Sequence, residues 1–376
     1  MIERLHYTTI KERTFQGKVI LLLGPRQVGK TTVVRAVAQA IDIDYLYLNA
    51  DEPDVPQLLS GKSSTELKAL IGDRKLVLLD EAQRIEDIGL RLKLLVDRYP
   101  EIQLLVTGSS SLELSNRAQE PLTGRKFEYQ LYPLCYAELE QHFGVLETNR
   151  LVEDRLLYGG YPEIVTAPGE QRIERLKTLA SSYLYKDILA LQDVRKPELL
   201  ARLLQALAFQ IGSQVSYQEL SRLLRVDNQT IERYVDLLEK AFVIFRLGSF
   251  SRNLRTELKR SKKIFFWDTG IRNALISNFQ PMALRQDKEA LWENYLVAER
   301  LKINHYQKRY ANTYFWRTHA QQELDYLEER DGRLYAFEFT WNPKKKKRIP
   351  ASFLTGYPGA VTQVVDRENF RDFLRP

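Results

Sequence analysis

Short apolar runs alternate with helical patterns in the first third of the chain. Residues 19–23, 45–48, 76–79 and 102–106 are mostly apolar, and the segments between them have the spacing of amphipathic helices. Apolar runs without regular polar positions are typical of strands that are covered on both faces. The pattern from about residue 18 to residue 132 therefore predicts an α/β fold, with a parallel sheet, right-handed crossovers and helices on both faces.

The rest of the chain shows helices first and then a mixture of strands and helices. Residues 147–191 are mostly helical, and two further helices, 217–224 and 228–240, are joined by a tight turn that predicts a helix-turn-helix. Strand-like runs at 242–247 and 263–267 flank a basic loop, so this part has the pattern of a winged helix.

Beyond residue 281 the pattern predicts a third unit with a helix, three strands, a Lys-rich turn and a short α/β tail. We therefore expect a parallel-sheet domain, a helical subdomain, a winged helix and a small α/β domain, with the boundaries 1–145, 146–195, 196–280 and 281–376.

Composition adds the location of the positive charge. The formal charge is +7, and residues 195–263 contain 14 basic and 7 acidic side chains, so this segment accounts for the whole excess. Such a segment attracts polyanions, including nucleic acid. The single cysteine, Cys135, excludes an intrachain disulfide. The chain has neither a signal-like N-terminus nor an apolar run of about 18 residues, so we expect a cytoplasmic protein without membrane contact.

A phosphate-binding loop follows the first apolar run and opens a helix. Residues 24–31 read GPRQVGKT and satisfy the pattern GxxxxGK[ST], in which backbone amides surround a phosphate, the lysine reaches the β and γ phosphates, and the hydroxyl binds magnesium. The cofactors predicted are therefore ATP and Mg²⁺. The predicted nucleotide-binding residues are Gly24, Pro25, Arg26, Gln27, Val28, Gly29, Lys30, Thr31 and Thr32.

Two later strands end in polar residues that suit the same site. Asp80 and Glu81 follow a buried run, and we expect Asp80, with Thr31, to hold magnesium and Glu81 to orient the attacking water. Thr107 ends the next run and is a candidate for contact with the γ phosphate, although an ordinary strand-end cap is an alternative.

The motifs together resemble a known family. RQVGKTT at 26–32, LDEAQ at 79–83, TGSSS at 107–111, LTGR at 122–125, LYPL at 131–134 and GGYP at 159–162 look like those of prokaryotic AAA-type ATPases with a C-terminal domain of unknown function. This resemblance covers nearly the entire chain. It implies an AAA+ fold with a helical lid, a winged helix, a degraded nuclease-like domain and a homo-oligomer. Arg125 would be its trans-acting arginine, for which a structural ion pair is the alternative explanation.

The basic segment suggests contact with DNA, mainly with its backbone. Polar and basic side chains of the second helix and of the loop after it are of the types that contact bases and phosphates. The candidates are Gln229, Arg233, Arg252, Arg255, Lys259, Arg260, Lys262 and Lys263. Arg246 could also neutralise a phosphate. Winged helices also bind proteins, and Glu232, Asp236 and Glu239 on the same helix keep that alternative open.

Three carboxylates near the C-terminus resemble the PD-(D/E)XK nuclease pattern. Glu293, Asp325 and Glu338 occupy the helix, strand and strand positions, but Thr340 stands where such nucleases carry a lysine. The Lys-rich turn at 344–348 is poorly placed to supply the missing cation, so we predict a domain that grips DNA without cutting it.

The sequence thus favours an ATP-dependent motor or remodeller that acts on duplex or branched DNA. A nucleotide-controlled signalling or defence switch with a protein partner is the first alternative, and an active metal-dependent nuclease is the second.

Overall fold

The chain divides into two compact units, which we describe separately. The structure is a computed structural model that describes residues 2–108, 122–190, 197–251, 262–318, 320–345 and 347–375, with only the backbone for residues 182–190. Unit 1 comprises Met1–Leu134 and Lys240–Phe242, and unit 2 comprises Cys135–Glu239 and Val243–Pro376.

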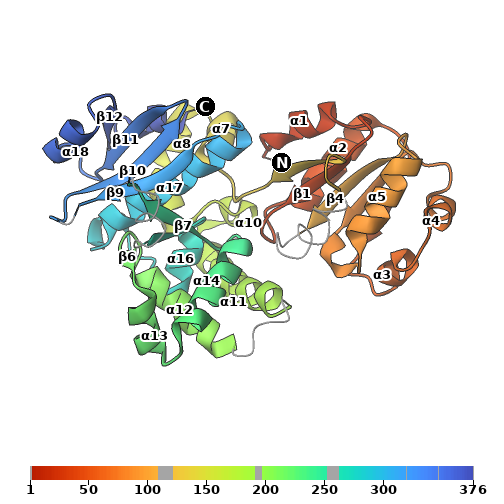
Figure 1. Ribbon diagram of the computed structural model, residues 1–376, viewed down its shortest axis with the longest axis horizontal. Helices are drawn as coiled ribbons and strands as arrows, with labels where there is room; N and C mark the ends of the chain where they lie inside the picture. Colours follow the sequence, from red (N-terminus) through yellow and green to blue (C-terminus); the bar gives the residue numbers. More distant parts are fainter. Residues whose placement is uncertain are drawn as a thin grey trace. The chain divides into compact units, whose positions relative to one another are not determined.

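Unit 1 is built on a five-stranded parallel sheet with the strand order β2-β3-β4-β1-β5 (Figure 1). The strands are β1 (Val19–Leu23), β2 (Tyr45–Asn49), β3 (Leu76–Asp80), β4 (Gln103–Gly108) and β5 (Lys126–Gln130). Every residue of β1, β3 and β4 is buried, as expected for strands with both faces covered. The predicted α/β class with a parallel sheet is therefore confirmed.

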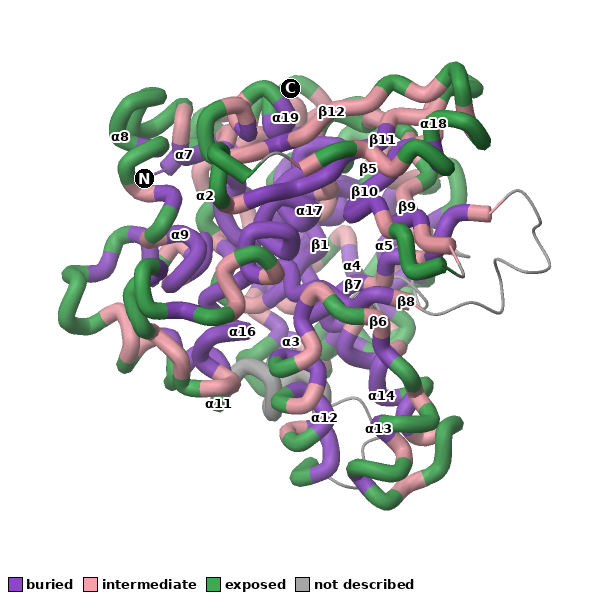
Figure 2. The backbone as a smooth tube through the Cα atoms, turned by 90° about the vertical axis from the view of Figure 1, so that its left-hand side faces the viewer, coloured by how far each residue is buried: buried purple, intermediate pink, exposed green. Residues whose placement is uncertain are grey.

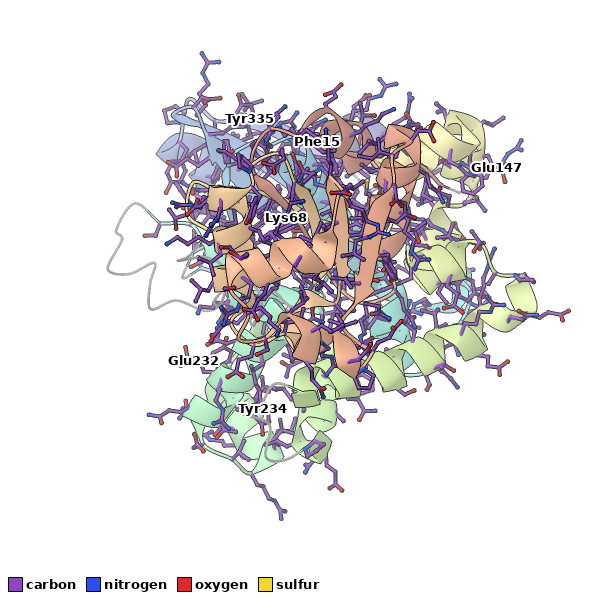
Figure 3. The ribbon with its side chains drawn as sticks, turned by 90° about the vertical axis from the view of Figure 1, so that its right-hand side faces the viewer. Phe15, Lys68, Glu147, Glu232, Tyr234 and Tyr335 are labelled. Carbon is purple, nitrogen blue, oxygen red and sulfur yellow. The ribbon has the colours of Figure 1, made fainter. Side chains whose placement is uncertain are left out.

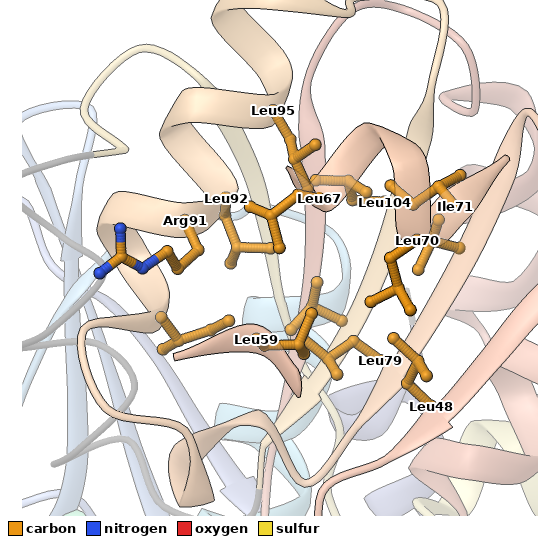
Figure 4. A pocket seen from close by; sticks show the side chains of 13 residues that line it. Leu48, Leu59, Leu67, Leu70, Ile71, Leu79, Arg91, Leu92, Leu95 and Leu104 are labelled. Carbon is orange, nitrogen blue, oxygen red and sulfur yellow. The ribbon is translucent and has the colours of Figure 1, made fainter. Parts of the chain in front are cut away.

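Helices cover both faces of this sheet. They are α1 (His6–Glu12), α2 (Lys30–Ile41), α3 (Asp54–Leu59), α4 (Ser64–Ile71), the 3₁₀ turn η1 (Ala82–Arg84) and α5 (Ile88–Arg98). Helices α3, α4 and α5 form one core with the sheet, around a cavity of about 30 Å³. Figure 4 shows leucines from the sheet and from these helices facing one another, while the Arg91 guanidinium points away from them. This core holds β3 and β4, whose ends carry the predicted site residues.

Unit 2 begins with a series of helices. They are α7 (Tyr136–Phe143), α8 (Val145–Arg150), α9 (Val152–Tyr158), α10 (Pro162–Val165), the 3₁₀ turn η2 (Gly169–Gln171), α11 (Arg172–Ala190), α12 (Pro197–Phe209), α13 (Tyr217–Leu224) and α14 (Asn228–Lys240). Later helices are α16 (Thr269–Leu275), the 3₁₀ turn η3 (Met282–Leu284), α17 (Lys288–Tyr306), α18 (Ala351–Gly356) and α19 (Phe370–Leu374). Helices α13 and α14 agree with the sequence pattern, and most of their apolar side chains are buried, although Leu223 of α13 is 57% exposed.

One seven-stranded sheet runs through unit 2, in the order β12-β11-β10-β9-β7-β8-β6. Its strands are β6 (Gln214–Val215), β7 (Ile244–Ser249), β8 (Lys262–Phe266), β9 (Asn312–Arg317), β10 (Glu323–Arg330), β11 (Arg333–Phe339) and β12 (Val361–Val365). Parallel pairing of β7 with β9 joins strands from both sides of residue 280. A sheet that is continuous across the boundary predicted at 280/281 was not foreseen from the sequence.

Helix α17 lies at the centre of unit 2, and the backbone tube in Figure 2 is almost entirely buried along it. A helix with buried residues on every side has no polar face to give it an amphipathic pattern. Its buried polar side chains therefore need partners within the unit. Among the described residues, no helix combines the length and apolar character that a membrane crossing requires.

The GGYP motif has a packing explanation in unit 2. The carboxylate of Asp268 accepts hydrogen bonds from the backbone N–H groups of Gly160 and Ile271, at 2.7 and 3.0 Å. Gly159 has a φ of +75°, and a Cβ atom there would lie 2.0 Å from Oδ1 of Asp268. Only glycine suits this position, because any side chain would meet both backbone strain and the buried carboxylate.

Candidate nucleotide-binding site

The phosphate loop connects β1 to the first residue of α2. Gly24 packs so closely on the segment after β5 that a Cβ atom would lie 2.0 Å from the carbonyl oxygen of Leu131. Lys30 is the first residue of α2, and its Nζ donates to the carbonyls of Gly24 and Pro25, at 3.0 and 2.8 Å. The lysine thus lies across the loop with its ammonium group held at the start of the loop.

The other loop residues are spread between β1 and the first turn of α2. Val28 is buried, Arg26 is half-buried, and Gln27 and Thr32 are exposed. Gln27 and Gly29 have positive φ angles of 58° and 93°. Left-handed backbone on both sides of Val28 curves the loop around the beginning of α2, where backbone N–H groups favour an anion.

Arg4 supports this loop and was missed by sequence reasoning. Its guanidinium donates to the carbonyl of Val28 at 2.5 Å and to that of Tyr132 at 2.6 Å, and the residue is only 6% exposed. It thereby ties the N-terminal segment to the phosphate loop and to the segment after β5. No local pattern marks it, because its partners lie 24 and 128 residues away.

The carboxylate of Asp80 lies at the centre of a network of hydroxyl groups. Oδ2 accepts from Thr31 at 2.7 Å and from Tyr47 at 3.1 Å, while Oδ1 accepts from the hydroxyl of Thr107. Burial, reinforced by the charge of Asp80, raises the pKa of Tyr47 and keeps its phenol protonated. The structure thus brings Thr31, Asp80 and Thr107 together and adds Tyr47, which the sequence analysis did not single out.

Glu81 directly follows β3 and has a left-handed backbone with a φ of 52°. Its backbone N–H donates to the hydroxyl of Thr107 at 3.2 Å, and its Oε2 accepts from Nε2 of Gln83 at 2.5 Å. Gln83 is 7% exposed, so the glutamate is held by a side chain that is itself fixed. The sequence analysis quoted Gln83 within a motif but assigned it no role.

This donor set suits a nucleotide with magnesium. A lysine at the start of a helix matches a phosphate, and a carboxylate beside a threonine hydroxyl matches a hard cation that retains several water molecules. Among the described residues, the hydroxyls of Thr31, Tyr47 and Thr107 donate to the carboxylate of Asp80, and they orient it without cancelling its charge. The roles of these residues remain predictions.

Arg125 forms an ion pair within unit 1. Its Nε lies 2.5 Å from Oδ1 of Asp97, and both side chains are about two-fifths exposed. The alternative explanation, a structural ion pair, is therefore present in the structure. Such an exposed pair contributes little to stability, so it leaves the arginine able to exchange partners.

The candidate DNA contacts have different environments. Gln229 and Arg233 are exposed on α14, and Lys262 is half-buried at the start of β8. Arg252, Arg255, Lys259 and Arg260 lie outside the described residues.

Two basic side chains do not fit the predicted phosphate contacts. Lys263 is 1% exposed and lies between Glu293 and Glu323, so the prediction that it contacts DNA is wrong. Arg246 is paired with both Asp236 and Glu239, and these ion pairs occupy the charge that a phosphate would need.

Each of the three C-terminal carboxylates contacts a lysine side chain. Lys263 contacts Glu293, and Lys347 contacts both Asp325 and Glu338. The expectation that the Lys-rich turn is poorly placed to supply a cation is therefore wrong, because Nζ of Lys347 lies 3.6 Å from Asp325 and 2.7 Å from Glu338. Burial raises the pKa values of Glu293 and Glu338, although Lys263 and Lys347, respectively, act in the opposite direction.

Three family descriptions match successive parts of the chain. The AAA domain matches residues 16–140, a domain of unknown function (DUF8612) matches 149–282, and a second domain of unknown function (DUF4143) matches 288–369. The phosphate loop and the network around Asp80 lie within the AAA match.

Similar proteins include the uncharacterized protein MJ1637 of Methanocaldococcus jannaschii, which is 25% identical over 73% of this chain and 67% of its own. Among solved structures, the RuvB Holliday junction branch migration motor of Thermotoga maritima is 16% identical, with a TM-score of 0.34 over 65% of this chain and 90% of its own. The uncharacterized protein Rv2008c of Mycobacterium tuberculosis is 32% identical over 88% of this chain and 71% of its own. The chain therefore belongs to the same family as Rv2008c, and its AAA domain makes it an AAA+ ATPase.

Proposed function

We propose that this AAA+ ATPase binds DNA and hydrolyses ATP with magnesium to drive movement on duplex or branched DNA. The observation that carries the proposal is the network around Asp80. It unites residues of the phosphate loop, β3 and β4 at one end of the sheet. A basic segment in the same chain supports a polyanionic partner.

Each residue of the nucleotide site has a role in this proposal. Magnesium would neutralise charge on the β and γ phosphates. Lys30 binds the phosphates, Thr31 and Asp80 hold the metal and its water shell, and Glu81 orients the attacking water. Thr107 donates a hydrogen bond to Asp80 and accepts one from the backbone of Glu81. A contact between Thr107 and phosphate would therefore affect the position of Glu81.

Contacts with DNA are proposed at residues 252–260, which lie outside the described part of the structure, and at α14. Residues 252–260 contain four basic side chains and one acidic side chain. Arg233 and Gln229 would add contacts from an exposed helix face. Because backbone phosphates dominate such contacts, the affinity should fall steeply with salt. We further propose a homo-oligomer in which Arg125 exchanges Asp97 for the nucleotide of a second copy.

Binding to duplex, forked and four-way DNA tests this proposal. We expect a gel shift at low salt that weakens at least about tenfold between 50 and 200 mM salt. Arg255→Ala combined with Lys259→Ala should reduce binding to every DNA and flatten the salt dependence, whereas Lys11→Ala, an exposed change in α1, should not. Unaltered mobility of all three DNAs at low salt would reject DNA binding.

A nucleotide-controlled signalling or defence switch is the second candidate function. It is favoured by the ion pairs of Arg246 on β7 with Asp236 and Glu239 on α14, which neutralise one of the basic side chains of this segment. Glu232, also on α14, is exposed, whereas Tyr234 is buried. Both residues are labelled in Figure 3. A stoichiometric protein partner in the purified sample, together with salt-independent behaviour towards nucleic acid, would support the switch instead.

A further inference from the structure

Four carboxylates of unit 2 lie in one cluster, which we call the carboxylate cluster. It consists of Glu293 on α17, Glu323 and Asp325 on β10, and Glu338 on β11. Three of them match the PD-(D/E)XK pattern, in which carboxylates hold a divalent cation. Two lysines enter the same cluster in this structure, so its fit to a metal needs a direct examination.

Lys347 bridges the two carboxylates of the central strands. Its Nζ lies 2.7 Å from Oε1 of Glu338 and 3.6 Å from Oδ2 of Asp325. This Oδ2 atom also accepts a hydrogen bond from the backbone N–H of Phe339 at 2.7 Å. The ammonium group therefore lies between the two acids that a bridging cation would contact.

Lys263 bridges the other two carboxylates from β8. Its Nζ lies 2.7 Å from Oε1 of Glu293 and 2.5 Å from Oε1 of Glu323, and its side chain is 2% exposed. Arg317 lies 3.4 Å from the second oxygen of Glu323. A buried ammonium ion is tolerated only where such acids compensate it, so this lysine and its two acids depend on one another.

The donor set does not fit a resident metal. A divalent cation needs several oxygen atoms at about 2.0–2.6 Å, and here one oxygen of each carboxylate already contacts an ammonium group. Within the described residues, no group of three or more His, Cys, Asp or Glu side chains is arranged to hold a metal ion. With four acids against Lys263, Lys347 and Arg317, most of the charge is compensated by the protein itself.

One atom shows where a cation would enter if an ammonium group were removed. Oε2 of Glu338 is buried and has no hydrogen-bond partner among the residues that the structure describes, and the residue is 9% exposed. Without Lys347, this oxygen would join Oε1 of the same residue and Oδ2 of Asp325 as uncompensated acceptors. Buried charges are tolerated where they are paired or coordinate a metal, so a cation that entered here would compensate these acids in place of the ammonium group.

We infer that Lys263 and Lys347 take the place of a divalent cation in the carboxylate cluster, so that the cluster balances its charge without a metal. Its role is then to join β8 and the turn after β11 to α17 and β10. This inference does not rest on the ATPase or on DNA binding, because none of its residues belongs to the nucleotide site.

The test is a Mn²⁺ titration of the nucleotide-free full chain, followed by electron paramagnetic resonance. Asp80→Asn is used as the common background to remove binding at the phosphate loop. In this background we expect no Mn²⁺ binding that requires Asp325. Lys347→Met should add one Mn²⁺ site at least about tenfold tighter than any binding in the background, and a further Asp325→Asn change should abolish it. Lys347 is 27% exposed on a turn, so its replacement should be tolerated.

Several outcomes would overturn the inference. The first is a Mn²⁺ ion that binds the background protein and is lost with Asp325→Asn. The second is DNA cleavage by the unaltered chain that requires both Mn²⁺ and Asp325. The third is a folded Lys347→Met variant that gains no Mn²⁺ site. A second measurement is the thermal midpoint of the Asp80→Asn background without nucleotide. It should be the same in EDTA and in Mn²⁺, and a fall in EDTA that a further Asp325→Asn change removes would also contradict the inference.

Discussion

Carboxylates from strands are central to both units, but they have opposite kinds of partner. Asp80 in unit 1 is contacted by the hydroxyls of Thr31, Tyr47 and Thr107, which carry no charge. Asp325 and Glu338 in unit 2 are contacted by the ammonium group of Lys347. Neutral donors orient a carboxylate and leave its charge available, whereas a lysine orients it and cancels the charge.

The comparison shows that residue type at a strand end is a weak guide to chemistry. The same types of acid can bind the metal ion of a nucleotide or form ion pairs within the protein. Which of these occurs depends on partners that are distant in sequence. Lys347 follows Glu338 by nine residues, and Lys263 precedes Glu293 by thirty. The following predictions test each side of this comparison.

The largest effect is expected from Lys30→Ala. The ammonium group makes charge-assisted contacts with phosphate, and its loss should weaken ATP binding by at least about 100-fold. Isothermal titration with ATP and magnesium measures the change. Lys11→Ala, an exposed lysine of α1, is the matched control and should bind ATP normally. Equal affinities for the two variants would remove Lys30 from the site.

Glu81→Gln should slow hydrolysis by about 100-fold or more while ATP still binds. The change removes the group that polarises water but keeps Asp80 and its three hydroxyl contacts. Single-turnover hydrolysis and nucleotide binding measure the two effects separately. Glu86→Gln changes an exposed acid five residues later and serves as the control. Normal turnover by Glu81→Gln would show that the assigned role is wrong.

Asp287 tests the effect of cationic partners on a carboxylate that lies outside both the network around Asp80 and the carboxylate cluster. Burial alone would raise its pKa, but hydrogen bonds from Arg285 and Arg272 outweigh burial and lower it to about 2. The folded state therefore gains stability above the ordinary pKa of about 3.8, and this gain is lost as the pH falls towards 2.

The loss corresponds to about 2 kcal/mol. Thermal midpoints between pH 6 and pH 2.5 should fall less steeply for Asp287→Asn, which already lacks the contribution at pH 6. Asp372→Asn is the control, because its side chain is 71% exposed. Parallel pH profiles for the unaltered chain and Asp287→Asn would contradict the assignment.

Arg4→Met should weaken ATP binding by about tenfold, because the carbonyls of Val28 and Tyr132 lose a buried donor and the phosphate loop becomes less ordered. Since the guanidinium acts through the loop, the apparent KM should rise more than kcat falls. Arg4→Lys keeps the charge but cannot reach both carbonyls in the same way, and it should restore part of the affinity. A loss confined to kcat would argue against a positioning role.

The sequence predicted the elements with strong local patterns. The apolar runs of β1 to β4 and the stripes of α13 and α14 are visible within a few residues, and the phosphate loop has a fixed spacing. β5 was not singled out, because its residues Lys126–Gln130 mix polar and aromatic side chains at a sheet edge. The pairing of β7 with β9 depends on residues about 65 positions apart, which no local pattern records.

For the candidate site, too, the sequence predicted the residues that belong to motifs and missed those that do not. Lys30, Thr31, Asp80, Glu81 and Thr107 belong to motifs, so their proximity followed from the parallel order of the strands. Arg4 and Tyr47 carry no motif, and their importance depends on which backbone and carboxylate they reach. Lys263 looked like a surface charge because the sequence does not show that Glu293 and Glu323 surround it.

The central claim is that ATP hydrolysis in unit 1 serves action on DNA. The most direct measurement is the steady-state rate of ATP hydrolysis with and without duplex, forked and four-way DNA at low salt. We predict stimulation by at least one of these DNAs, lost in Glu81→Gln and reduced as salt rises. A rate that is the same with and without all three DNAs would contradict the claim.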